Sequence, residues 1–131
     1  MISIIITAFK EPETIKKCVK SIISQKIKEN YELLVIAPDK ETLESAKKAS
    51  KKAITLKDNA IGKWNALNKG FKKAKGRLLI LCDGDTYLEA NSINPIITAF
   101  NNEEVGIVSG RVISINKKDN LIEYWSRLLT N

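Results

Sequence analysis

The 131-residue chain carries 22 Lys and Arg against 15 Asp and Glu, a net charge of +7, with 44% hydrophobic and 28% charged residues. This size favours one domain that buries its own core, and the composition excludes collagen-like, disulfide-stapled and disordered chains. The sequence holds no histidine, which excludes histidine triads, histidine general bases and histidine-bound metals.

The positive charge comes largely from lysines that recur in pairs, such as Lys16-Lys17 and Lys72-Lys73. Solvated helix faces explain such pairs, and a surface that attracts anionic substrates, lipid headgroups or nucleic acid is the alternative. Aromatic residues make up only 6% of the chain. This low content makes nucleic acid the less favoured partner, because single-stranded bases stack on aromatic rings.

Cysteine usage and the first residues indicate the compartment. Cys18 and Cys82 are far apart in the sequence and both fall in apolar segments, which predicts buried free thiols in a reducing cytoplasm. Met1 leads directly into an apolar run without a basic segment, and no apolar run approaches the ~20 residues of a membrane span. We expect a cytoplasmic protein, with association to a membrane surface as the alternative.

Apolar runs and helical spacings alternate along the chain. Strands are predicted at residues 2–7, 33–36, 53–56, 78–82 and 105–112. Helices are predicted to begin at Pro12, after a cap at Asp39, near Trp64 and at Asn94-Pro95, with Gly76 closing the third. The run 78–82 is the most continuously apolar and is predicted to be the most buried strand.

This alternation predicts an α/β fold, a three-layer sandwich with a mostly parallel sheet. Ligands of such sheets bind beyond the carboxyl ends of the strands. The segments after four of the predicted strands, residues 7–11, 37–39, 58–63 and 83–85, each contain a carboxylate. We therefore expect the functional site at this edge of the sheet.

Asp83-Gly84-Asp85 is the strongest candidate among these segments. Two carboxylates separated by glycine can turn toward one point and share Mg²⁺ or Mn²⁺, although an ordinary Asp-Gly turn is the alternative. Lys63, near the start of a predicted helix, can hold a diphosphate. The loop after the first strand lacks the glycine patterns of dinucleotide and P-loop sites, which disfavours those enzymes.

Two long stretches carry a family resemblance. Residues 2–11 through 21–25 resemble the opening of family 2 glycosyltransferases of the GT-A fold, and residues 62–70, 76–77 and 81–86 resemble the middle section of the same family. The resemblance covers the chain from Met1 to about Val112. It implies that Thr7, Phe9 and Glu11 line the nucleoside pocket and that Lys63 meets the diphosphate. It further implies that Asp83 lies near the ribose and Asp85 binds the metal, with Asp83 as the second candidate ligand.

Two positions depart from the family pattern. The family often has adjacent aspartates after the second strand, where this chain has Ala37 and Pro38, and Asp39 follows one step later as the candidate for base binding. Family members also carry a downstream carboxylate that deprotonates the acceptor, and no matching motif is present here. The tail carboxylates Asp119 and Glu123 are interpreted as a helix cap and a surface charge.

The resemblance implies that residues 1–131 form a single GT-A-like nucleotide-sugar-binding domain, short for the family and without its acceptor segment. The expected function is binding of a UDP- or GDP-sugar with Mg²⁺ or Mn²⁺ and transfer of the sugar, with inversion, to an unidentified lipid-linked or polysaccharide acceptor. The alternatives are a donor-binding half without full activity, a nucleotidyltransferase, and a basic module that binds anionic membrane or nucleic acid.

The tail is amphipathic at residues 120–129, with Leu121, Ile122, Trp125, Leu128 and Leu129 on one face of a predicted helix. Packing on its own sheet is the favoured interpretation. Peripheral membrane contact and formation of a homodimer are the alternatives.

Overall fold

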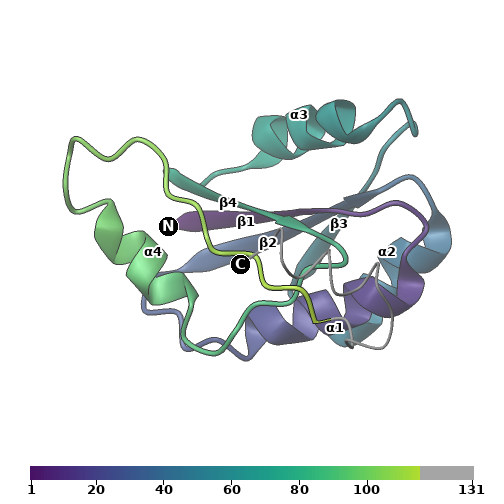
Figure 1. The fold of residues 1–131 in the computed structure, drawn as a ribbon. Helices are drawn as coiled ribbons and strands as arrows, with labels where there is room; N and C mark the ends of the chain where they lie inside the picture. The colour runs from purple at the N-terminus through teal and green to yellow at the C-terminus, as the bar shows by residue number, and fades with distance from the viewer. Residues whose placement is uncertain (116–131) are drawn as a thin grey trace. The chain divides into compact units, whose positions relative to one another are not determined.

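The computed structural model describes residues 1–115 of the chain, so the tail prediction for residues 120–129 lies outside the described residues. The chain divides into two compact units, Met1–Asn94 and Pro95–Asn131. The elements are, in order, β1 (Ile2–Thr7), α1 (Pro12–Ile23), β2 (Tyr31–Ala37), α2 (Lys40–Ala49), β3 (Ala53–Lys57), α3 (Lys63–Lys73), β4 (Leu78–Asp83) and α4 (Ile93–Ala99). The first seven elements lie in the first unit (Figure 1).

Strands β1 to β4 form one parallel sheet in the order β3-β2-β1-β4. In β1, Ile5 pairs with Leu34 of β2 on one side and with Leu81 of β4 on the other. All six residues of β1 are buried, as expected for a β-branched run covered on both faces. The predicted parallel sheet is confirmed.

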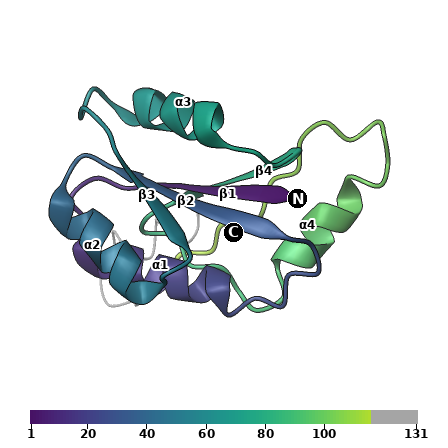
Figure 2. The same cartoon turned by 180° about the vertical axis from the view of Figure 1, so that it is seen from behind.

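Helices cover both faces of this sheet. Helix α3 lies on one face, and α1 and α2 lie on the other, as the two opposite views show (Figure 1 and Figure 2). Helix α1 begins with Pro12, as predicted, and buries a stripe of Ile15, Cys18, Val19 and Ile22. The three-layer arrangement predicted from the alternating pattern is therefore confirmed.

Helix α3 packs through small residues and not through its aromatic ones. Ala66 and Gly70 are buried, whereas Trp64 is 64% exposed and Phe71 is 40% exposed. A Cβ atom on Gly70 would lie 2.7 Å from the Ile5 side chain. The helix thus approaches β1 closely because glycine presents no side chain there.

The prediction that residues 78–82 form the most buried strand is wrong. Strand β4 exists, but it lies at the edge of the sheet, and Leu79 and Leu81 are 40% and 51% exposed. Helix α3 packs over β1 and β2, which leaves the side chains on its face of β4 uncovered. Apolar continuity alone does not reveal the position of a strand within a sheet.

The predicted fifth strand at residues 105–112 is also wrong. The structure has no regular secondary structure over these residues, and Ile107 and Val112 are 90% and 67% exposed. A β-branched run becomes a strand only when a neighbouring strand accepts and donates its backbone hydrogen bonds. None of the strands described within residues 1–115 pairs with this run.

Candidate active site

A cavity of about 490 Å³ lies at the carboxyl ends of the strands. Its volume falls within the range of small-molecule sites. The lining side chains come from the segments that follow all four strands: Thr7, Ala8, Phe9, Glu11, Pro38, Asp58, Ala60, Gly62, Lys63, Ala66, Asp83, Gly84 and Asp85. Six of the seven predicted nucleotide-sugar residues are therefore brought together, and Asp39 is the exception.

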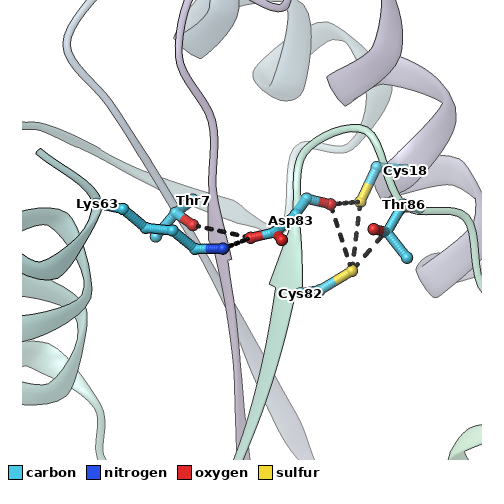
Figure 3. A network of polar contacts seen from close by, with 6 residues as sticks. All are labelled: Thr7, Cys18, Lys63, Cys82, Asp83 and Thr86. Atoms are coloured by element: carbon cyan, nitrogen blue, oxygen red, sulfur yellow. Dashed lines mark hydrogen bonds and ion pairs between the residues drawn. The ribbon is translucent and has the colours of Figure 1, made fainter. Parts of the chain in front are cut away.

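An ion pair connects two sides of this cavity. The Lys63 Nζ lies 2.6 Å from the Asp83 Oδ1 (Figure 3). Lys63 is the first residue of α3 and Asp83 is the last of β4, so the pair joins elements that only the fold brings together. The Thr7 hydroxyl donates to the same Asp83 oxygen at 3.5 Å. The Lys63 and Asp83 side chains are 61% and 49% exposed, which leaves both accessible to a ligand.

Gly84 allows the loop after β4 to close against the loop after β1. Its N–H donates to the Thr7 carbonyl at 2.9 Å. A Cβ on Gly84 would lie 2.6 Å from the Ala8 Cβ and 2.8 Å from the Glu11 Oε2, so a side chain would displace one of them. Glycine at this position is therefore required by a close approach.

The carboxylates around Gly84 create a negative environment. Burial raises the pKa of Glu11, and the nearby charges of Asp85 and Asp83 raise it further. Like charges held together in this way favour a proton or a bound cation. The site therefore combines one lysine with an excess of acidic groups.

These acidic groups fit a hard cation that is completed by other ligands. Within residues 1–115, no three acidic or cysteine side chains are grouped closely enough to hold a metal ion by themselves. Mg²⁺ is usually bound by one or two carboxylates together with water and substrate phosphates. The oxygen donors of Asp83 and Asp85 suit that type of site.

Asp39 performs a structural role in the described chain. Its Oδ1 accepts from the Thr42 N–H and its Oδ2 accepts from the Lys10 N–H, both at 2.9 Å. Burial alone would raise the pKa of Asp39, but the hydrogen bonds from Thr42 and Lys10 outweigh it and lower the pKa. The predicted helix cap is confirmed, and base binding by Asp39 stays a prediction.

Phe9 stands at the outer part of the loop after β1. Its side chain is 56% exposed, and the Lys10 Nζ lies 5.5 Å from the ring centroid. An exposed ring beside the cavity is available for stacking on a flat ligand. Phe9 is therefore not part of the hydrophobic core.

Cys18 and Cys82 lie next to the backbone of Asp83. Their Sγ atoms are 3.9 Å apart, and both thiols approach the Asp83 carbonyl oxygen at 3.5 Å (Figure 3). The hydrogen bond with Cys82 and burial raise the pKa of the Cys18 thiol far above its ordinary value. The prediction of buried free thiols is confirmed. Both thiols contact the backbone carbonyl of Asp83.

Asp58 is a cavity residue in the predicted segment 58–63 to which the sequence assigns no role. It follows β3 directly, its N–H donates to the Ala37 carbonyl at 3.1 Å, and its side chain is only 7% exposed. The signal that points to it is its position after a strand of a parallel sheet. The tail residues Asp119 and Glu123 lie outside the described residues.

No helix in the described part of the chain is long and apolar enough to cross a bilayer.

A parallel sheet flanked by helices, with an acidic and lysine-containing cavity at its carboxyl edge, defines a GT-A-like domain. Residues 3–129 match glycosyl transferase family 2. The chain therefore belongs to this family.

Comparisons with individual proteins are consistent with this family assignment. The chain is 29% identical over 118 residues to glycosyltransferase AglE of Haloferax volcanii, covering 85% of this chain and 39% of that protein. The crystal structure of S. aureus TarS 1-349 superimposes with a TM-score of 0.64 at 23% identity, over 78% of this chain and 32% of that one. A TarS 1-349 structure in complex with UDP-GlcNAc has a TM-score of 0.62 at 23% identity, over 79% and 32%. The chain thus spans well under half the length of these proteins.

Proposed function

We propose that this chain binds a nucleoside diphosphate sugar together with Mg²⁺ or Mn²⁺ and acts as the donor site of a glycosyltransferase. The observation that carries the proposal is the cavity in which Lys63, Asp83 and Asp85 meet at the carboxyl ends of the strands. Membership in glycosyl transferase family 2 supports the reaction class.

Each side chain has a role that suits the donor. The Lys63 ammonium, at the first residue of α3, binds the diphosphate by charge and adds to the positive end of the helix. When the diphosphate arrives, Lys63 exchanges its Asp83 partner for phosphate oxygens. The Asp83 carboxylate is then free to accept from a ribose hydroxyl or to share the cation.

Asp85 and Asp83 would hold the metal. A bound divalent cation neutralises the charge that develops on the departing nucleoside diphosphate. Lys63 supplies positive charge to the same phosphates from the α3 side. The exposed ring of Phe9 covers the nucleoside from the loop after β1, and Thr7 and Glu11 line the same part of the cavity.

The donor is proposed to be a UDP- or GDP-sugar. The TarS structure in complex with UDP-GlcNAc makes UDP-GlcNAc the first compound to test. We propose inversion at the anomeric carbon from the family resemblance. The acceptor is not identified by the residues of this cavity.

Calorimetry tests the proposal directly. UDP, GDP and their sugars are titrated into the protein with and without Mn²⁺, and binding is expected only with the metal. Asp85→Ala should weaken metal-dependent binding at least about tenfold, since a charged ligand group is lost. Glu41→Ala, an exposed acidic residue on α2, is the matched control. Absence of binding to every nucleotide would refute the proposal.

Sugar transfer is a separate measurement from binding. Among residues 1–115 we assign no general base for the acceptor hydroxyl, and loss of such a base typically lowers a rate about 10²–10⁴-fold. We therefore expect donor binding with slow transfer and slow donor hydrolysis by the isolated chain. Turnover as fast as that of full-length family members would show that the chain contains its own base.

A further inference from the structure

We propose that Asp58 reads the nucleobase of the donor by accepting a hydrogen bond from a ring N–H of uracil or guanine. This inference rests on the proposed function and adds a specificity-determining residue to the same cavity. It explains how a base is selected when the segment after β2 offers no free carboxylate.

The positions after β2 are poorly suited to this task. Ala37 and Pro38 carry no polar side chain, and both oxygens of Asp39 are engaged by the N–H groups of Thr42 and Lys10. Asp39 also does not line the cavity. Releasing it would break the cap of α2 and free the loop after β1.

Asp58 has the properties that a base-reading residue needs. It lines the cavity and is 7% exposed, so little water competes for its carboxylate. Its Oδ1 accepts from the Ala60 N–H at 2.7 Å, which orients the group. Among the described residues no hydrogen bond to its Oδ2 is found, so this oxygen is available to a ligand.

The position of Asp58 in the sheet places it at the nucleoside end of the cavity. Strand β3 lies at one edge and β4 at the other, so the backbone of Asp58, directly after β3, and that of Asp83, the last residue of β4, are about three strand spacings apart, roughly 14 Å. Asp83 and Asp85 occupy the β4 end with the proposed metal and diphosphate. Pro38, Ala8 and Phe9 lie in the segments between, where they offer apolar surface for a flat base.

An ionised carboxylate only accepts hydrogen bonds, and this defines the base. Uracil presents its N3–H, and guanine presents its N1–H and amino group, to such an acceptor. Cytosine and adenine present an unprotonated ring nitrogen at the corresponding position, which repels a carboxylate. Asp58 therefore favours uracil or guanine over cytosine and adenine.

The test compares UDP, GDP, CDP and ADP by calorimetry in the presence of Mn²⁺. The wild-type protein is expected to bind UDP or GDP about tenfold or more tightly than CDP and ADP. Asp58→Asn keeps an oxygen for the Ala60 N–H and adds an amide donor that can pair with the cytosine N3. Asp58→Asn should therefore weaken the binding of UDP or GDP, strengthen the binding of CDP, and remove most of the difference between their affinities.

Controls separate base reading from loop support. Glu41→Gln, at an exposed acidic residue of α2 outside the cavity, should leave the ranking of the four nucleotides unchanged. Asp58→Ala should lower affinity for the preferred nucleotide, with urea unfolding used to verify that it remains folded. An unchanged ratio of UDP to CDP affinity in Asp58→Asn would overturn the role of Asp58, as would equal wild-type affinities for all four nucleotides. Either result would leave the proposed function standing. If the wild type binds no nucleotide at all, the proposed function fails with it.

Discussion

Gly84 links the acidic loop after β4 to the loop after β1 through a contact that has no room for a side chain. Its ideal Cβ position lies 2.6 Å from the Ala8 Cβ, which is far inside van der Waals contact. The same position is 2.8 Å from the Glu11 Oε2. The geometry of Asp83 and Asp85 therefore depends on the residue between them.

We expect Gly84→Ala to destabilise the fold by about 1–3 kcal/mol, the usual cost of overpacking. Donor affinity should fall in parallel, because Ala8 or Glu11 must move. Urea unfolding and calorimetry measure the two effects. Gly106→Ala is the matched control, since nothing lies within 4 Å of its Cβ position. Equal stabilities of the two variants would contradict the close packing at Gly84.

Lys63 is the second residue with a separable effect. Lys63→Ala should weaken binding of a nucleoside diphosphate about tenfold, because one charge-assisted contact to phosphate is lost. Binding of the parent nucleoside, which has no phosphate, should not change. Lys73→Ala, which removes an exposed lysine from the last turn of the same helix, should match the wild type. An equal loss in both lysine variants would indicate general charge attraction instead of a specific contact.

Among the elements, α2 and the loop after β1 are coupled through hydrogen bonds at the start of α2. Asp39 accepts from the Lys10 N–H, and the Thr42 hydroxyl accepts from the Glu11 N–H at 2.9 Å. The carboxylate and the hydroxyl thereby hold two consecutive backbone groups next to the cavity. The helix start thus positions the loop that carries Phe9 and Glu11.

Asp39→Ala should cost about 1 kcal/mol of unfolding free energy at neutral pH, the typical value for a lost N-cap. Because the folded-state pKa of Asp39 is lowered from its ordinary 3.8, its contribution is present above that pH and is lost as pH falls through the lower folded value. The stability difference from the wild type should therefore shrink in strong acid. Asp39→Asn should retain most of the cap, and a pH-independent difference would contradict this account.

Strand β4 shows what an element's own sequence leaves undetermined. Its apolar run predicts a strand, and Asp83 and Asp85 were predicted as site residues because they follow it. Its place at the edge depends on the pairing with β1, and the exposure of Leu79 and Leu81 depends on where α3 packs. Neither contact can be predicted from residues 78–83 alone.

For the molecule as a whole, a net charge of +7 permits nonspecific attraction to polyanions, which the proposed site does not require. Metal-dependent donor binding should increase the free energy of unfolding through mass action, by about 2.7 kcal/mol at a ligand concentration one hundred times Kd. The melting temperature should therefore rise. EDTA should reverse this shift. Binding to an oligonucleotide should instead weaken steeply with salt and need no divalent metal. The melting temperature is measured at low and high salt with UDP-GlcNAc and Mn²⁺, or with an oligonucleotide. This comparison distinguishes metal-dependent donor binding from nonspecific binding to polyanions.

The sequence by itself determined the parallel α/β class, the strands β1 to β4 and the edge of the sheet where the site lies. These follow from local propensity, hydrophobic period and the rule that loops after parallel strands meet at one edge. Only the tertiary structure decided that Lys63 pairs with Asp83, that Asp39 also holds the Lys10 N–H, and that Asp58 is buried. The edge position of β4, and the lack of regular secondary structure over residues 105–112 in the described part of the chain, belong with these. The physical reason is that burial and hydrogen-bond partners depend on residues distant in the chain, whereas propensity and period are local properties.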